Sequence, residues 1–153
     1  MMITTALLAG CVASPFDKRG REVSGLTPAE ALSRPEARGA LVLWGGRVVG
    51  VVNAGEQTEL EMLALPLRMG DMPDRDADGS VRFVIRHNGF LEPMNFAPGR
   101  FVTAMGRFVD VEERSVGAFP LRHAVMESMQ LELWPVDPNS NRPNINFGVG
   151  VWF

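Results

Sequence analysis

The sequence contains a single cysteine, no tyrosine and only two histidines among 153 residues. One cysteine excludes an internal disulfide framework and a cysteine-rich zinc site. Fifteen lysines and arginines stand against 18 aspartates and glutamates, so the net charge is −3 and nothing in the composition attracts nucleic acid. No apolar run reaches the ~20 residues of a transmembrane helix. We therefore expect one soluble domain that does not bind nucleic acid.

Catalytic and cofactor motifs are also missing. A Gly-x-Ser-x-Gly nucleophile elbow is absent, and the Gly45-Gly46 pair stands inside an apolar stretch instead of before a helix, so it is no phosphate loop. His87 and His123 have no neighbouring cysteine and no repeated spacing that would suggest a metal site. We therefore expect no catalytic residues, no metal and no cofactor.

The N-terminal residues Met1 to Ala13 are apolar apart from two threonines, and they contain the run Leu8-Ala9-Gly10-Cys11. Leucine and two small residues before a cysteine match the bacterial lipobox, so we expect residues 1–10 to be a lipoprotein-type signal peptide and Cys11 to be lipidated. No lysine or arginine precedes this run, which a start upstream of Met1 would explain. Val12 follows the cysteine where an aspartate would favour inner-membrane retention, so the outer membrane is the expected destination.

Residues 11–25 are polar and interrupted by proline and glycine, which predicts a lipidated tether. The order Thr27-Pro28-Ala29-Glu30 predicts a short helix, because threonine caps and glutamate reaches back to the cap. Residues 136–153, rich in proline and asparagine, are expected to be a flexible aromatic tail.

Residues 26–135 are predicted to form a mainly β domain, a small OB-like barrel of about five strands. Glycines inside long apolar strands indicate bulges or sharp bends, as at barrel corners. A β-sandwich fragment is the alternative. On the last strand, Val125, Met129, Leu131 and Leu133 are assigned to the apolar face, and Ser128, Gln130 and Glu132 to the solvent face. The expected core includes Trp44, Leu60, Met105 and Leu131. The expected strands are 40–52, 57–65, 81–86, 101–111 and 125–134.

A series of short motifs follows in a fixed order along the predicted domain: Val42-Leu43-Trp44-Gly45-Gly46, Asn53, Thr58-Glu59-Leu60-Glu61, Leu65-Pro66-Leu67, Gly89-Phe90-Leu91-Glu92-Pro93, Gly99-Arg100-Phe101-Val102-Thr103 with Gly106, and Leu133-Trp134-Pro135. This series resembles the Slp family of outer-membrane lipoproteins, and Cys11 falls where that family carries its lipidated cysteine. The resemblance implies location and fold but transfers no catalytic residue and names no ligand.

Two acidic patterns could carry chemistry. Asp74, Asp76 and Asp78 with the following glycine copy part of a calcium loop, but Ile85 stands where a bidentate glutamate belongs, so a solvated turn is expected. Glu59 and Glu61 lie two apart on one strand, ~6.7 Å along the chain, within the range of an inverting glycosidase pair. Ordinary strand alternation explains them as a solvent face.

The function predicted from the sequence is a non-enzymatic outer-membrane lipoprotein, anchored through Cys11 on the periplasmic face, whose barrel binds an envelope protein or other envelope component. The alternative is an OB-like module that binds a small ligand or oligomer in its strand groove. A glycan- or lipid-processing enzyme is a distant third. A polar or aromatic groove would favour a ligand, and an apolar patch would favour a protein partner.

Overall fold

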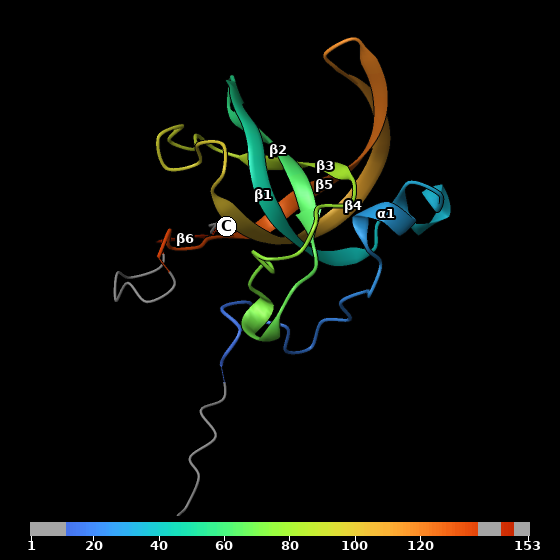
Figure 1. The fold of residues 1–153 in the computed structure, drawn as a ribbon. Helices are drawn as coiled ribbons and strands as arrows, with labels where there is room; N and C mark the ends of the chain where they lie inside the picture. The colour runs from blue at the N-terminus through green and yellow to red at the C-terminus, as the bar shows by residue number, and fades with distance from the viewer. Residues whose placement is uncertain (1–11, 138–144, 149–153) are drawn as a thin grey trace, which may run out of the picture.

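The computed structural model describes residues 12–137 and the backbone of residues 145–148. Within these residues, strands dominate, with one short α-helix and two 3-10 turns (Figure 1). Their bounds are α1 Pro28–Ala31, η1 Pro35–Ala37, β1 Leu41–Ala54, β2 Gln57–Leu65, η2 Met69–Asp71, β3 Arg82–Asn88, β4 Phe101–Val116, β5 Phe119–Leu133 and β6 Ile145–Gly148.

The strands close into a barrel. β1 pairs with β2 and β4, β2 also pairs with β3, and β4 also pairs with β5, all antiparallel. A parallel ladder between residues 83–86 of β3 and 124–127 of β5 completes the circle of five strands. β6 pairs with β5 at residues 130–133, outside that circle. The closed barrel confirms the OB-like prediction and excludes the β-sandwich fragment, which would need two separate facing sheets.

The barrel interior is filled by apolar side chains that alternate along each strand. Trp44 lies at its centre, with its ring edge-on to Phe83 at 5.5 Å and tilted against Phe108 at 5.9 Å between centroids. The indole Nε1 donates to the Leu26 carbonyl at 2.7 Å, so the one polar atom of this buried ring is satisfied. The predicted core residues Trp44, Leu60, Met105 and Leu131 are all buried, although Met105 packs on the outer side of the barrel.

Two strands, β4 and β5, are much longer than the sequence predicted. β4 continues five residues beyond the expected end at Val111, and β5 begins six residues before the expected start at Val125. The extra residues form a long, curved hairpin whose tip projects beyond the barrel (Figure 1). Most of them are polar or exposed on both faces, so no apolar alternation marked them as strand.

The face assignment of β5 was wrong at Val125, Ser128 and Met129, and Glu132, assigned to the solvent face, is buried. Ser128 pairs with Gly106 and Gln130 with Met105, so Met129 is an extra residue at a β-bulge. A bulge shifts the alternation by one residue, which leaves Val125 facing outward and Met129 39% exposed. Glu132 alternates with Leu131 and Leu133 as predicted, but it is only 1% exposed because its outer face is covered. Its pairing partner Thr103 donates to the Asp71 carbonyl of the 66–75 loop on that face. The core side of β5 is therefore Ala124 and Met126 before the bulge, and Leu131 and Leu133 after it.

The capped helix is confirmed. Thr27 accepts from the Glu30 backbone N–H at 3.2 Å, and the Glu30 carboxylate accepts from the Thr27 backbone N–H at 2.9 Å. This reciprocal capping box stabilises a helix of only four residues. Ala31 of the helix is fully buried in the barrel core, so α1 helps to cover the barrel.

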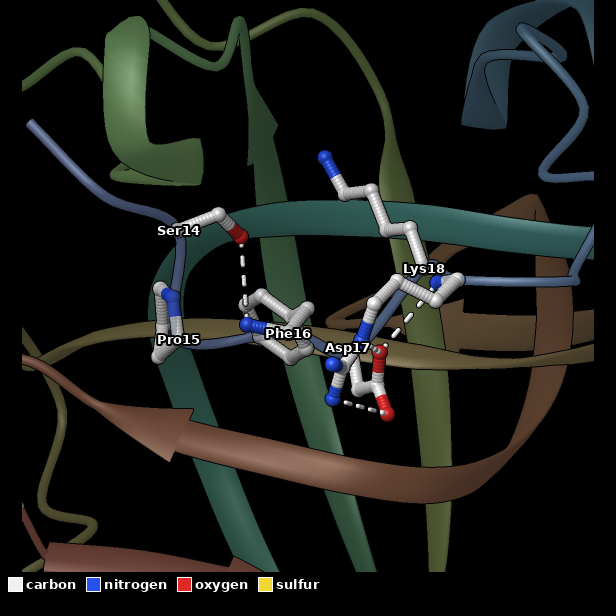
Figure 2. A pocket seen from close by; sticks show the side chains of 6 residues that line it. Ser14, Pro15, Phe16, Asp17 and Lys18 are labelled. Carbon is white, nitrogen blue, oxygen red and sulfur yellow. Dashed lines mark hydrogen bonds and ion pairs between the residues drawn. The ribbon is translucent and has the colours of Figure 1, made fainter. Parts of the chain in front are cut away.

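Residues 12–25 were expected to be a tether, but they pack along the outside of the barrel. Phe16 is 5% exposed and forms a small cluster with Leu41 and Met105. Ser24 makes a parallel bridge to Val42. Figure 2 shows the Phe16 ring directed at the strands while Lys18 extends away from it. One buried aromatic ring and a strand-like bridge thus fasten a mostly polar segment to the fold.

Two glycines allow unusually close backbone contact between strands. A Cβ atom at Gly46 would lie 2.0 Å from the Leu63 carbonyl oxygen, and one at Gly106 would lie 2.0 Å from the Glu127 carbonyl oxygen. Both positions belong to the long strands that coil around the barrel. Glycine is therefore required there because a side chain would force the paired strands apart.

We predict that Gly46→Ala destabilises the protein by more than ~2 kcal/mol, because the new methyl group meets backbone that cannot move freely. Gly50→Ala is the matched control on the same strand: a Cβ there has no atom within 4 Å, and its φ is outside the left-handed region. The control should change stability by less than ~0.5 kcal/mol. Denaturant midpoints measure both, and equal midpoints would contradict the close-contact argument.

Candidate functional site

The outer face of β2 and β3 carries a closed circuit of ion pairs. Arg86 Nε lies 2.9 Å from Glu59 Oε1, and Arg86 Nη2 lies 2.6 Å from Glu112 Oε1. Arg114 Nη1 lies 2.8 Å from Glu59 Oε2, and Arg114 Nη2 lies 2.8 Å from Glu112 Oε2. Each of these four residues thus contacts two opposite charges. We call Glu59, Arg86, Glu112 and Arg114 the charged ring.

The charged ring joins the long hairpin to the barrel. Glu59 comes from β2 and Arg86 from β3, whereas Glu112 and Arg114 come from the extension of β4. Beside the ring, Glu61 accepts from Arg82 at 2.6 Å and lies 3.3 Å from His123 Nε2 on β5. Beneath these charges Val84 and Val125 are fully buried, although neither belongs to the interior cluster. The hairpin therefore covers the barrel wall on this side.

These contacts keep both glutamates of β2 ionised. The hydrogen bonds from Arg114, and then from Arg86, lower the pKa of Glu59 to about 2 despite its partial burial. Burial favours the neutral form of Glu61, but hydrogen bonds from Arg82 and His123 outweigh it and its pKa is lowered. A glycosidase pair needs one carboxyl with a raised pKa to donate a proton. Glu59 and Glu61 offer no such acid.

The two histidines lie in different environments: His123 contacts Glu61 beside the charged ring, whereas His87 lies inside the barrel. His87 is 5% exposed inside the barrel, where Nδ1 lies 2.9 Å from Ser128 Oγ. Burial lowers the pKa of His87. This contact resembles half of a nucleophile–base pair, but Ser128 is only 9% exposed and a substrate could not reach it without opening the barrel. We interpret the pair as a satisfied polar contact in the core.

The aspartate loop is held by an arginine. Arg68 Nη2 lies 2.7 Å from Asp74 Oδ1 and 3.2 Å from Asp76 Oδ2, so one guanidinium contacts two of the carboxylates that a calcium loop would use. The hydrogen bond from Arg68 lowers the pKa of Asp74. Across the described ranges, no three potential ligands gather as a metal site.

Exposed apolar side chains occur near the ends of both long hairpins. Val52, close to the β1–β2 turn, is 62% exposed, and Phe119 and Leu121, just after the β4–β5 turn, are 72% and 43% exposed. In Figure 1 both hairpin tips project to the same side of the molecule, opposite the first described residues and η2. We call Val52, Phe119 and Leu121 the hairpin end.

The N-terminal segment also lines hollows. One of about 650 Å³ is bordered by residues 14–19 (Figure 2), and one of about 750 Å³ by residues 20–25, residues 39–41, Arg107 and Met129. Both lie along this segment and not on the charged face of β2 and β3. On the face of β2 and β3 on which the ligand-binding alternative depends, the described residues instead form the ion pairs of the charged ring.

Cys11 lies outside the described residues. Its neighbour Val12 is exposed and next to the 66–75 loop, since a Cβ at Gly70 would lie 2.6 Å from Val12 Cγ1. The helices among residues 12–137 lack the length and apolar character needed to cross a membrane.

Comparison with known proteins identifies the family. The model of the outer membrane lipoprotein Slp family matches residues 8–152, nearly the whole sequence. The chain belongs to the Slp family. Membership indicates the outer membrane as its location and confirms the resemblance found in the motifs. No solved structure matches it.

Relatives of this Slp-family chain include three curated proteins. It is 30% identical over 148 residues to the uncharacterised lipoprotein YeaY of Escherichia coli, with 86% of this chain and 75% of YeaY covered. It is 26% identical over 149 residues to the outer membrane protein Slp of Escherichia coli, with 95% and 76% covered. It is 23% identical over 142 residues to an uncharacterised protein of Haemophilus influenzae, with 89% and 75% covered.

Several motif residues of this Slp-family chain have structural roles. Thr58 Oγ1 donates to the Gly89 carbonyl at 2.7 Å and accepts from the Leu91 backbone N–H at 3.2 Å, while Asn53 Nδ2 donates to the Leu91 carbonyl. These bonds fix the loop after β3 across the barrel, where Leu91 is fully buried. The contacts of these motif residues therefore stabilise the fold, and they do not indicate a reaction.

Sequence reasoning missed the hairpin half of the charged ring and the buried carboxyl of Glu132. Glu112 and Arg114 were assigned to no strand, although their spacing of two matches the spacing of Glu59 and Glu61 on β2. Charged residues spaced two apart lie on one face of a strand, so this spacing could have indicated that the strand continues through Glu112 and Arg114. The burial of Glu132 had no signal, because it depends on tertiary contacts over the outer face that it shares with Thr103.

Glu132 makes the pH dependence of stability testable. Neither carboxylate oxygen has a hydrogen-bond partner among the described residues, and burial raises its pKa from 4.5 to about 7. Between these pH values the folded protein holds a proton that the unfolded chain has released, so stability falls as pH rises. Glu132→Gln should remove this loss and gain ~1–3 kcal/mol at pH 8, with little change at pH 4.

Unfolding measured from pH 4 to pH 8 checks this expectation. Glu127→Gln, which changes an exposed glutamate on the same strand, is the control and should keep the wild-type slope. A parallel pH profile for wild type and Glu132→Gln would show that the Glu132 carboxyl is not the group responsible.

Proposed function

We propose that this chain is a non-enzymatic lipoprotein, anchored through lipid on Cys11 on the periplasmic face of the outer membrane, whose barrel binds a partner protein of the envelope. The observation that carries the proposal is the placement of the hairpin end. The hairpin end lies near the two hairpin tips, which project to the side opposite the first described residues (Figure 1). An anchor at Cys11 would leave the hairpin end facing away from the membrane.

The chemistry of the described residues supports a binding role. Glu59 and Glu61 are held ionised by arginines, and Ser128 is nearly inaccessible beside His87. The charged face of β2 and β3 is internally neutralised, which leaves little unpaired polarity to hold a small ligand. Exposed apolar side chains on projecting hairpins fit a protein partner better.

The second candidate is an OB-like module that binds a small ligand or oligomer on the strand face. Its support is positional, because the face of strands 2 and 3 with the adjacent hairpin loops is the usual ligand surface of this fold. Opening the charged ring would be needed for such a ligand to enter.

The anchor is tested by Cys11→Ala. Wild-type protein should partition into the detergent phase and incorporate labelled acyl chains, since lipidation requires the thiol. Cys11→Ala should remain unprocessed and carry no acyl label, and a smaller fraction of it should partition into the detergent phase. Protease treatment of intact cells should spare the wild-type protein if it faces the periplasm. Identical processing and labelling of both proteins would refute the anchor.

The partner surface is tested by photo-crosslinking in living cells. A photoreactive residue at Phe119 and one at Val52 should yield the same discrete adduct, because both positions belong to the hairpin end. Val136 is the matched control, since its exposure of 72% equals that of Phe119 but it lies off the hairpins. Phe119→Asp should abolish the adduct formed from position 52. Equal adducts from position 136 would contradict a partner at the hairpin end.

A further inference from the structure

Two arginines lie against the Phe101 ring on the barrel wall, and a third precedes Phe101 in the chain. Arg47 of β1 pairs with Phe101 of β4, and its Cζ lies 5.9 Å from the Phe101 ring centroid. Arg75, from the loop between η2 and β3, places its Cζ 4.7 Å from the same centroid. Arg100 directly precedes Phe101. We call Arg47, Arg75 and Arg100 the arginine cluster.

Backbone carbonyls of the three residues that follow β5 accept hydrogen bonds from two of these guanidinium groups. Arg100 Nη2 donates to the Trp134 carbonyl at 3.3 Å, and Arg75 donates to the carbonyls of Pro135 and Val136, the latter at 2.7 Å. Consecutive residues place these acceptors only a few ångströms apart. Two positive charges are therefore fixed near each other by uncharged acceptors.

The arginine cluster has no carboxylate counterpart in the described part of the chain. The ion pairs seen there use other arginines, including Arg38, Arg68, Arg82, Arg86 and Arg114. The Nε atoms of Arg47, Arg75 and Arg100 are all buried and have no hydrogen-bond partner. Since the whole chain carries a net charge of −3, this local excess of positive charge is specific to the cluster.

We propose that the arginine cluster binds a phosphate group. A guanidinium donates in a planar fork that fits phosphate oxygens, and an anion would relieve the repulsion among three close cations. Phosphate fits better than a carboxylate, because it offers more oxygens and up to two negative charges to three donors. The group could belong to a phospholipid headgroup or to a soluble phosphate compound. The site is separate from the hairpin end and does not depend on a protein partner.

The cluster residues are unequal in structural importance, which makes the proposal testable. Arg75 and Arg100 donate to backbone carbonyls, so their loss could disturb the fold. Arg47 shows no hydrogen bond in the described structure and contacts the Phe101 ring. Arg47→Gln should therefore leave the melting temperature close to wild type while removing one third of the cluster charge.

The test uses the full chain in a zwitterionic detergent, with the arginine Nε–Hε signals followed by nuclear magnetic resonance. The probes are inorganic phosphate, dihexanoyl-phosphatidylglycerol, dihexanoyl-phosphatidylcholine and acetate. Phosphate should shift the signals of the arginine cluster saturably, and added salt should weaken binding. Arg47→Gln should weaken it about tenfold, the size expected for one charge-assisted hydrogen bond. Arg122→Gln, at an exposed arginine on the hairpin, should have no effect.

The outcomes separate the sources of the phosphate. Tighter binding of dihexanoyl-phosphatidylglycerol than of inorganic phosphate supports a lipid headgroup, and the reverse supports a soluble phosphate compound. Arg47→Lys should restore only part of the affinity, because it keeps the charge but loses the planar fork. Absence of saturable shifts with every phosphate probe, equal binding of acetate, or unchanged affinity in Arg47→Gln would overturn the proposal.

Discussion

The parallel pairing of β3 with β5 is the constraint on which the rest of the structure depends. It involves only four residues of each strand, 83–86 and 124–127, yet it turns a sheet with two edges into a barrel. Because β5 is much longer than this ladder, it extends past β3 at both ends. One extension continues into the hairpin with β4, and the other presents an edge that β6 occupies. Closure thus creates both projections.

The extension of β4 and β5 accounts for the ion pairs on the outer face of β2 and β3. Val84 and Val125 face outward from the barrel and would be exposed without it, so their burial favours bringing the hairpin over the wall. The same movement takes charged side chains partly out of water, which costs desolvation energy. In the charged ring each charge has two opposite neighbours, and this arrangement offsets that cost better than an isolated pair could. The ring is best understood as part of the closure.

The sequence was sufficient to predict features that depend on local chemistry. The helix at Thr27 follows from its capping box, β2 from its apolar alternation, and the strand glycines from their place in apolar runs. Features that depend on tertiary contacts could not be predicted. The bulge at Met129 reverses the faces of β5, and burial of Phe16 turns a polar segment into part of the barrel surface.

The arginines of this protein lie in two kinds of environment, and the difference bears on function. Arg86 and Arg114 are each held by two carboxylates and serve to fasten β-structure. Arg47, Arg75 and Arg100 are instead held by an aromatic ring and backbone carbonyls, which orient a guanidinium without neutralising it. A cation that is oriented but not neutralised is prepared for an external anion, whereas a neutralised one is not. The net charge of the chain does not show this difference. It is seen only when the contacts of each arginine are compared.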